Sequence, residues 1–231
     1  MNMVLHGIDT PNIVHTNTLN QALSDIQPRD QHDVILANPP FGSGERTEVQ
    51  QNFPIRSGET AYLFMQHFMR KLKPGGRAAI VIKISFLSND DAEKLRKELL
   101  ETSNLHTVLV CPDKTFGTTG VKTIVLFFEK GAPTRRIWYY ALDAGRSLGK
   151  KNPLNDEDLA EFLKLQPKRT ESEKSWTLDI ADVDPEKWDL SAKNPNTPEA
   201  EPLRAPAEII TSMLSRDKDT RVLLEQVRGL L

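Results

Sequence analysis

Two short apolar runs flank a segment with helical periodicity, and this alternation most constrains the fold of the chain. Residues 32–37 and 78–84 are almost continuously apolar, as strands buried on both faces are. Between them, residues 59–72 carry apolar side chains at helical spacing, and the Lys-Pro-Gly-Gly turn at 73–76 ends that helix. A strand, a helix and a second strand predict a right-handed crossover and a mainly parallel sheet.

The rest of the first 142 residues predicts how this sheet continues. Residues 90–101 have the pattern of a charged helix, residues 105–111 form another apolar run, and residues 12–16 could add a short strand. Residues 121–129 and 135–141 resemble two strands joined by a turn too short for a helical crossover, so they predict an antiparallel pair at one edge. The expected fold class is α/β, with a mainly parallel sheet and an antiparallel edge pair.

The composition predicts three parts. Residues 1–142 form the domain just described, and residues 143–205, rich in charge, Pro and Asn, predict an irregular extension. This extension has four scattered anchors, Phe162, Trp176, Trp188 and Leu190. Residues 206–231 predict a C-terminal helix with one apolar stripe that ends in Leu230 and Leu231. The helix packs either on its own domain or, as a subunit-interaction helix, on helices of another subunit.

Charge and cysteine content exclude several classes of protein. The 231 residues carry a net charge of -2, so the chain lacks the global positive field of an autonomous nucleic-acid binder. If it acts on DNA, we expect a partner to supply much of the grip. The single cysteine, Cys111, excludes an intramolecular disulfide and lies in an apolar run that predicts a core position. No membrane span or signal peptide is evident, so we expect a cytoplasmic protein.

The tetrapeptide formed by Asn38, Pro39, Pro40 and Phe41 is the strongest chemical signal. It directly follows the first apolar run, so it lies at the carboxyl edge of the predicted sheet, where open α/β folds bind their ligands. There it offers an amide side chain, a rigid backbone with free carbonyls and an aromatic face. These groups suit a planar amino group that receives a methyl: Asn38 and the Pro39 carbonyl accept its hydrogens, while Phe41 stacks on a base swung out of the helix.

Six further segments, taken with the tetrapeptide, give the chain a family resemblance. They are LHGI at 5–8, KPGGRAAIV at 73–81, FLSND at 86–90, GVKTIVLFFEKG at 120–131, IWYY at 137–140 and LSAKNPN at 190–196. In this order they resemble the modification (M) subunit of type I restriction-modification systems, an adenine-N6 DNA methyltransferase. The resemblance implies a Rossmann-like class I methyltransferase sheet, present here in part, with its adenine-specific catalytic domain in residues 1–142.

The resemblance also implies roles for individual residues. Asn38, Pro39, Pro40 and Phe41 match the catalytic tetrapeptide, and the implied cofactor is S-adenosyl-L-methionine. Asn17 matches the position from which the family supplies an acidic residue to the adenine of the cofactor, so this contact departs from the pattern. Phe116 lies where a second aromatic residue could pack on the target base. The implied partners are DNA, a sequence-recognition (specificity) subunit and a restriction subunit.

A larger departure from the family pattern lies before the tetrapeptide. The family has an N-terminal helical domain and then a glycine-rich loop around the methionine end of the cofactor, and residues 1–37 contain neither. We therefore expect an incomplete cofactor site in the C-terminal part of a truncated or split subunit, completed by a separate N-terminal fragment.

Two other functions fit the same residues. The chain could be a non-catalytic remnant or interaction module of the same complex, which keeps the fold and the C-terminal helix but binds no cofactor. It could also methylate RNA adenine or a protein glutamine, both planar nitrogens, although glutamine methylators usually have Tyr in place of Phe41. The five histidines lack metal-ligand spacing, so no metal site is expected.

Overall fold

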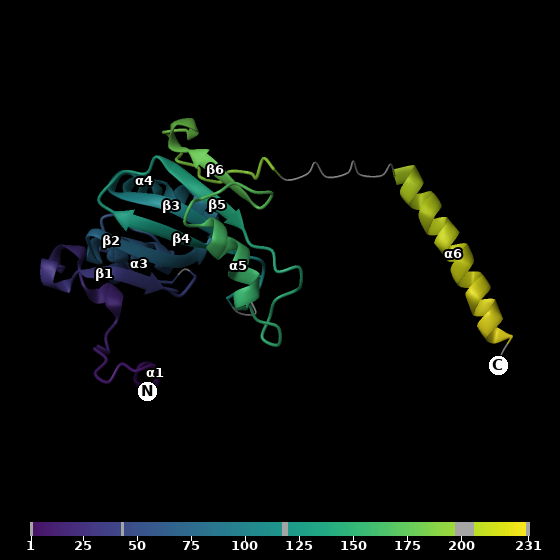
Figure 1. The fold of residues 1–231 in the computed structure, drawn as a ribbon, viewed down its shortest axis with the longest axis horizontal. Helices are drawn as coiled ribbons and strands as arrows, with labels where there is room; N and C mark the ends of the chain where they lie inside the picture. The colour runs from purple at the N-terminus through teal and green to yellow at the C-terminus, as the bar shows by residue number, and fades with distance from the viewer. Residues whose placement is uncertain (1, 43, 117–119, 197–205, 230–231) are drawn as a thin grey trace. The chain divides into compact units, whose positions relative to one another are not determined.

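The computed structural model describes residues 2–42, 44–116, 120–196 and 206–229, and the chain divides into two compact units at residue 196 (Figure 1). The helices are α1 (Asn2–Leu5), α2 (Thr47–Gln50), α3 (Thr60–Lys71), α4 (Glu93–Thr102), α5 (Asp156–Leu165) and α6 (Pro206–Arg228). The strands are β1 (His32–Ala37), β2 (Leu72–Lys83), β3 (Ser103–Val110), β4 (Thr123–Lys130), β5 (Arg136–Ala141) and β6 (Ser175–Asp179). Short 3-10 turns join several of these elements.

The six strands form one sheet in the order β1-β2-β4-β3-β5-β6. Strands β1, β2, β3 and β5 run in one direction, whereas β4 and β6 run in the other. Helices α3 and α4 bury their apolar sides in the main core against one face, and α5 packs on the other face through Phe162. The predicted α/β class, with a mainly parallel sheet and an antiparallel edge pair, is confirmed.

The membership of the edge pair differs from the prediction. Strands β4 and β5 do not pair with each other: β4 inserts between β2 and β3, and the edge pair is β5 with β6. Thr134, in the connection after β4, explains the difference. Its hydroxyl donates to the Ser103 carbonyl at 2.6 Å and accepts the Leu105 N–H at 2.8 Å. These bonds hold the connection across the start of β3, so β5 begins on the far side of that strand.

The segment expected to be irregular contains two regular elements. Helix α5 begins at a capping box, in which Asn155 and Asp158 bond each other's backbone N–H groups. Strand β6 extends the sheet because Trp176 stacks on Tyr139 of β5, with ring centroids 5.3 Å apart. Trp176, Phe162 and Leu190 are buried, as expected of anchors, so the charged composition concealed a helix and a strand.

Strand β1 has its predicted bounds but not its predicted burial. Val34 and Leu36 are 45% and 77% exposed, whereas Ile35 and Ala37 pack against the main core. The difference arises because β1 is the edge strand of the sheet and only the face toward α3 is covered. The strand expected at residues 12–16 is also absent, and this part of the described chain has no regular structure.

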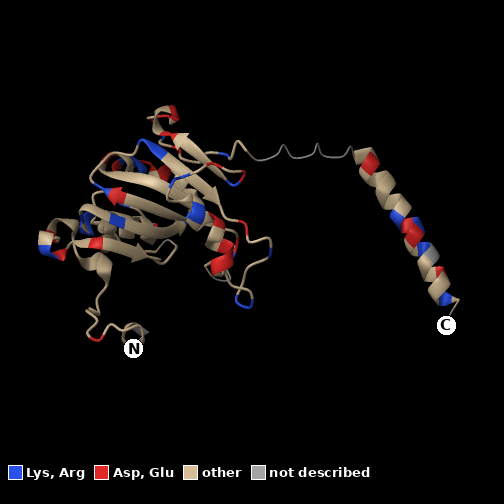
Figure 2. Ribbon diagram, viewed as in Figure 1, with Lys and Arg blue, Asp and Glu red and all other residues tan. Residues whose placement is uncertain are grey.

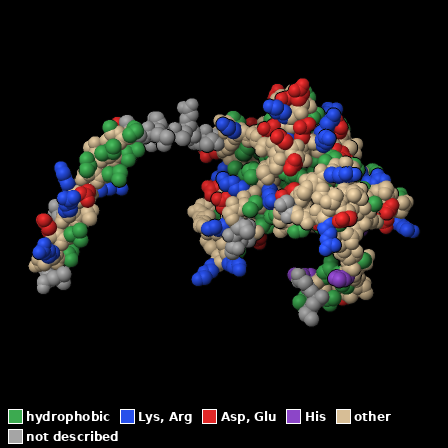
Figure 3. Space-filling model, turned by 180° about the vertical axis from the view of Figure 1, so that it is seen from behind, with side chains coloured by type: hydrophobic (Ala, Val, Ile, Leu, Met, Phe, Trp, Pro, Cys, Tyr) green, Lys and Arg blue, Asp and Glu red, His purple; other side chains and the backbone are tan. Residues whose placement is uncertain are grey.

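Two other predictions concern a core residue and the last helix. Cys111 is buried, as predicted, and burial raises the pKa of its thiol to about 11. Helix α6 forms, and its apolar residues Ile209, Ile210, Met213, Leu214, Leu223, Leu224 and Val227 are exposed. Figure 2 marks a group of charged residues in the middle of this helix, and Figure 3 shows hydrophobic side chains along it. Leu230 and Leu231 lie outside the described residues. No helix of the described chain is long and apolar enough to cross a membrane.

Candidate active site

The tetrapeptide follows β1 at the carboxyl edge of the sheet. Asn38 is exposed, Pro39 is buried, and Phe41 is half-buried against the main core. The Asn38 carboxamide has no hydrogen-bond partner within the described part of the chain. Pro39 and Pro40 fix φ at two consecutive residues, and Pro39 is buried. The Asn38 side chain therefore projects from a stiff backbone. The arrangement presents a neutral donor and acceptor group at the ligand-binding edge.

Gly42, the next residue, is held through both of its backbone polar groups. Its N–H donates to Oε1 of Glu59 at 2.7 Å, and its carbonyl accepts the Thr60 N–H at 3.1 Å. Its φ of +123° is one that residues with side chains rarely adopt, so glycine is required for this geometry. The exit of the tetrapeptide is therefore tied to the first turn of α3.

The same carboxylate is paired with a cation from the sheet. Oε2 of Glu59 lies 2.7 Å from Nζ of Lys83, the last residue of β2, and both side chains are partly buried. Glu59 also receives support from Ser57, whose hydroxyl accepts its N–H at 3.0 Å. Burial, and after it the Glu59 charge, raise the pKa of the neighbouring Tyr62. One carboxylate thus joins the tetrapeptide loop, α3 and β2.

Phe116 lies on the loop between β3 and β4, which also emerges at the carboxyl edge. The side chain is 40% exposed, and the preceding turn is held by Thr115, whose N–H and hydroxyl both bond the Pro112 carbonyl. Lys114 in this turn has a φ of +65°. The structure therefore brings Phe116 to the same edge of the sheet as Asn38 and leaves its ring accessible.

The Asn17 side chain caps a local turn. Its side-chain oxygen accepts the Leu19 N–H at 3.1 Å and caps the 3-10 turn Thr18–Asn20. Leu19 in turn is buried in a small core with Val49, Phe53 and Leu63. The acceptor oxygen of Asn17 is therefore engaged, and its amide N–H groups are the part left to bind a ligand. The contact with the cofactor stays a prediction.

The described residues do not fit the whole of S-adenosylmethionine. No glycine-rich turn between a strand and a helix precedes β1 in the described chain, where Gly7, with a φ of +80°, only ends the single turn of α1. The methionine end of such a ligand would need backbone that a side chain does not block. Among described residues, no group of three or more His, Cys, Asp or Glu could hold a metal ion.

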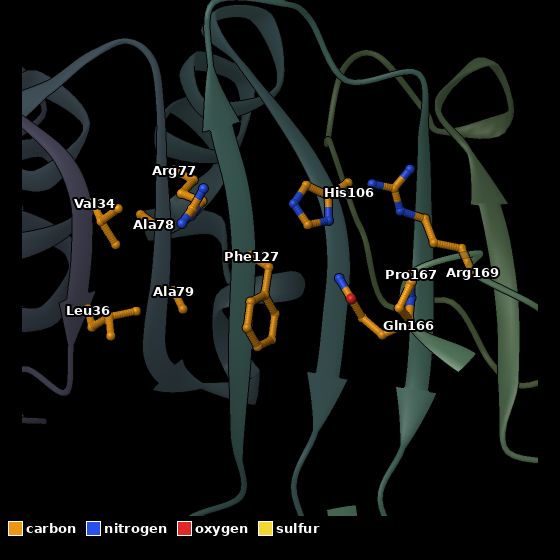
Figure 4. A pocket seen from close by; sticks show the side chains of 10 residues that line it. All are labelled: Val34, Leu36, Arg77, Ala78, Ala79, His106, Phe127, Gln166, Pro167 and Arg169. Atoms are coloured by element: carbon orange, nitrogen blue, oxygen red, sulfur yellow. The ribbon is translucent and has the colours of Figure 1, made fainter. Parts of the chain in front are cut away.

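Two hollows lie near these elements without including the tetrapeptide. One, of about 450 Å³, lies on the sheet face that α3 does not cover, and Figure 4 shows Leu36, Phe127 and His106 along it. Burial lowers the pKa of His106 to about 4. The other, of about 300 Å³, lies at the carboxyl ends of β2 and β3 and is lined by Ser85, Trp176 and others. The hollow of about 450 Å³ forms because this face of β1, with Val34 and Leu36, is not covered.

Glu59 and Lys83 are the site residues that the sequence reasoning missed. A signal for both was present: Lys83 breaks an apolar run at the end of a predicted strand, and Glu59 begins the predicted helix. Because the predicted strand ends and the predicted helix begins at the tetrapeptide's edge, topology places both charges at that edge but does not show that they pair.

Comparison with known proteins places this geometry in a family. A family model described as N-6 DNA Methylase matches residues 1–202. The chain belongs to the N-6 DNA methylase family. As an N-6 DNA methylase chain, it is 34% identical over its whole length to the Type I restriction enzyme EcoEI methylase subunit of Escherichia coli, of which it covers 49%. It is also 34% identical to the EcoKI methylase subunit of Escherichia coli K12. That alignment covers 79% of this chain and 38% of the subunit.

Solved structures agree with these relatives. A chain solved in work on complex assembly and conformational transition of the type I R-M system superimposes with a TM-score of 0.79 at 36% identity, covering 100% of this chain and 51% of that one. A modification subunit of a putative type I restriction enzyme from Vibrio vulnificus YJ016 superimposes with a TM-score of 0.77 at 33% identity. The match covers 85% of this chain and 45% of that one. The expected resemblance to type I modification subunits is confirmed. The chain spans about half the length of the relatives it matches.

Proposed function

We propose that this chain carries the target-base half of an adenine-specific DNA methyltransferase, the modification subunit of a type I restriction-modification system. S-adenosylmethionine is the proposed methyl donor. One observation carries the proposal: an exposed Asn38 carboxamide without an intrachain partner projects from a rigid Asn-Pro-Pro-Phe turn at the carboxyl edge of the sheet. The match of the N-6 DNA Methylase model to residues 1–202 supports the reaction class.

The chemistry follows from the electronic state of the adenine amine. Its lone pair is delocalised into the ring, so the nitrogen is a weak nucleophile until its hydrogens are held and the lone pair is directed at the methyl. The Asn38 oxygen and the Pro39 carbonyl accept those two hydrogens. Neither group titrates in the physiological range, and both are held stiffly, so their contribution is orientation and stabilisation of the positive charge that develops on nitrogen.

Access to the amine requires that the adenine leaves the duplex. Phe41 provides the face on which the extruded base stacks, and its half-buried ring is fixed by contact with the main core. Phe116, exposed at the same edge, is the proposed second packing residue. Stacking on an aromatic ring contributes about 1–3 kcal/mol per base in single-stranded complexes, so two rings offset much of the unstacking cost.

The partners follow from charge and from α6. A net charge of -2 does not favour binding of DNA by this chain alone, so a sequence-recognition subunit is the proposed source of specificity and much of the affinity. The exposed apolar side chains of α6 are the proposed contact with other subunits of the complex, which include the restriction subunit.

Methyl transfer to DNA by the assembled enzyme tests this function. The chain is co-purified with its recognition subunit and any fragment that completes it, and transfer from labelled S-adenosylmethionine to a duplex is measured. Asn38→Ala should lower kcat by about 10²- to 10³-fold, the effect of removing a hydrogen-bond partner of the transition state. Asn104→Ala is the matched control, because Asn104 lies at the amino end of β3, away from the carboxyl ends of the strands where the tetrapeptide lies. An inactive wild-type assembly, or an Asn38→Ala variant with wild-type kcat, would refute the proposal.

A further inference from the structure

Glu59 joins three segments that meet beside the tetrapeptide. Its two carboxylate oxygens have separate partners, the Gly42 N–H at 2.7 Å and the Lys83 ammonium at 2.7 Å. The next residue, Thr60, donates its N–H to the Gly42 carbonyl at 3.1 Å. We call this arrangement of Gly42, Glu59, Thr60 and Lys83 the Gly42 clamp. It fixes both polar groups of the residue that follows Phe41.

The Gly42 clamp is built from rigid elements. Glu59 is the N-cap residue of α3, whose buried side chains include Tyr62, Leu63 and Met65. Lys83 ends a strand with partners on both sides, β1 and β4. Because helix and strand are held by the core, the carboxylate has little freedom to follow the loop. The loop must instead conform to the carboxylate.

The ion pair explains why the carboxylate keeps this position. A partly buried Glu59 without a cation would lose solvation and rotate toward water. Lys83 supplies the compensating charge and, by occupying one oxygen, leaves the other directed at Gly42. A charge-assisted N–H···O bond of 2.7 Å is also stronger than a neutral one. The N–H and the carbonyl of Gly42 are therefore both restrained by other residues of the chain.

We propose that Glu59, oriented by Lys83, is a positioning residue that sets the geometry of Asn38, Pro39 and Phe41 toward the target amine through Gly42. This inference rests on the proposed function. The clamp acts through the backbone of Gly42, because both carboxylate oxygens of Glu59 are engaged within the chain, one by the Gly42 N–H and the other by Lys83. Its effect is on the orientation of the two acceptors, where a displacement of about 1 Å can cost about 10²-fold in rate.

The test is steady-state methylation by the assembled enzyme with three variants. Glu59→Ala removes the acceptor and should lower kcat about 10- to 100-fold, with KM for DNA and for S-adenosylmethionine within about twofold of the wild type. Glu59→Gln keeps an oxygen for the Gly42 N–H and should recover most of that kcat. Glu101→Ala is the matched control, because it breaks an exposed Lys97–Glu101 ion pair on α4.

A fourth variant, Thr60→Pro, loosens the clamp from its other side and replaces Glu59→Ala in the test if that variant does not fold. Thr60→Pro removes the N–H that bonds the Gly42 carbonyl, yet proline is favoured at the first position of a helix. Glu59 already has an extended backbone, with φ -80° and ψ 109°, close to the conformation that a residue before proline adopts. The midpoint of thermal unfolding of the Thr60→Pro variant should stay unchanged, while its kcat falls several-fold.

Hydrogen exchange of the peptide that contains Gly42, measured in the assembled enzyme, gives a readout other than activity. Exchange should be faster in Glu59→Ala and near the wild-type rate in Glu59→Gln. If wild-type enzyme methylates DNA and Glu59→Ala, or Thr60→Pro in its place, keeps the wild-type kcat, the positioning role is overturned while the proposed function stands. If the wild-type assembly is inactive, the proposed function itself fails.

Discussion

The guanidinium of Arg96, on α4, donates through Nε to the main-chain carbonyl of Trp188 at 2.6 Å. Its other nitrogens donate to the carbonyls of Lys187, Phe86 and Asn89 at 2.7–2.9 Å. The side chain is 1% exposed, and no carboxylate within the described chain pairs with it at 4 Å or less. A buried cation therefore holds together two segments nearly one hundred residues apart.

Replacing Arg96 with Ala should lower the free energy of unfolding by about 3–5 kcal/mol, because four carbonyls lose a donor that is itself buried and a cavity is left in its place. Arg96→Lys should recover only part of this loss, since an ammonium cannot span the four acceptors as a planar guanidinium does. Urea unfolding measures both. Arg135→Ala, at an exposed position, is the control and should stay within about 0.5 kcal/mol of the wild type. An Arg96→Ala variant as stable as this control would contradict the role of the carbonyl network.

His67 should make the chain less stable in acid. Its ring is 1% exposed, neither nitrogen has a partner within the described chain, and burial lowers its pKa from 6.5 to about 4. In the unfolded chain His67 binds a proton as the pH falls through 6.5, whereas in the folded chain it binds one only near pH 4. Stability should fall as the pH drops through this window, by roughly 3 kcal/mol in total, and not above it.

Unfolding midpoints measured from pH 7.5 to 4 check this sign. His67→Leu should flatten the decline and keep or raise stability at pH 7, because it removes a buried polar ring without leaving a partner unpaired. His106, whose pKa burial also lowers to about 4, contributes in the same direction, so some slope should remain in the variant. An unchanged slope in His67→Leu would show that other groups control the acid transition.

Much of this fold was predictable from periodicity, because each strand of the first domain contains an apolar run and each long helix has an apolar side, although β2 also includes the Lys-Pro-Gly-Gly segment expected as a turn. The errors arose where pairing depends on contacts between distant residues. The hydroxyl of Thr134 carries the chain across β3, and no local pattern in residues 131–135 shows that. The stacking of Trp176 on Tyr139 likewise creates a strand inside a segment whose composition suggested none.

The candidate site was predictable in part for the same reason. Asn38 and Phe41 are adjacent in sequence, so their placement after a strand was sufficient to bring them to the carboxyl edge. Glu59 and Lys83 are 24 residues apart and meet only in three dimensions. The role of Asn17 as a cap depends on the 3-10 turn at residues 18–20, which forms where Leu19 packs into a small core with distant residues.

The uncovered face of β1 should distinguish two neighbouring residues. Leu36 is 77% exposed, so Leu36→Ser should change the free energy of unfolding of this chain by less than about 0.5 kcal/mol. Ile35 packs on the main core, and Ile35→Ala should cost about 2 kcal/mol. If another strand and helix cover β1 in the complete enzyme, Leu36→Ser should also weaken assembly, which analytical ultracentrifugation of the complex measures. A stability loss in Leu36→Ser equal to that in Ile35→Ala would contradict the exposed face.

Gly42 and Gly58 form a matched pair for testing backbone conformation at the site. Apart from its chain neighbours, no atom of the described residues would lie within 4 Å of a Cβ added to Gly42 or Gly58, so neither substitution creates a clash with them. Only Gly42 has a positive φ, +123°, which costs a residue with a side chain about 1–3 kcal/mol. Gly42→Ala should therefore shift the loop, break the bond from its N–H to Glu59 and lower kcat for methylation, while Gly58→Ala keeps wild-type kcat. Equal kcat values for the two variants would show that the conformation of Gly42 does not control the orientation of Asn38.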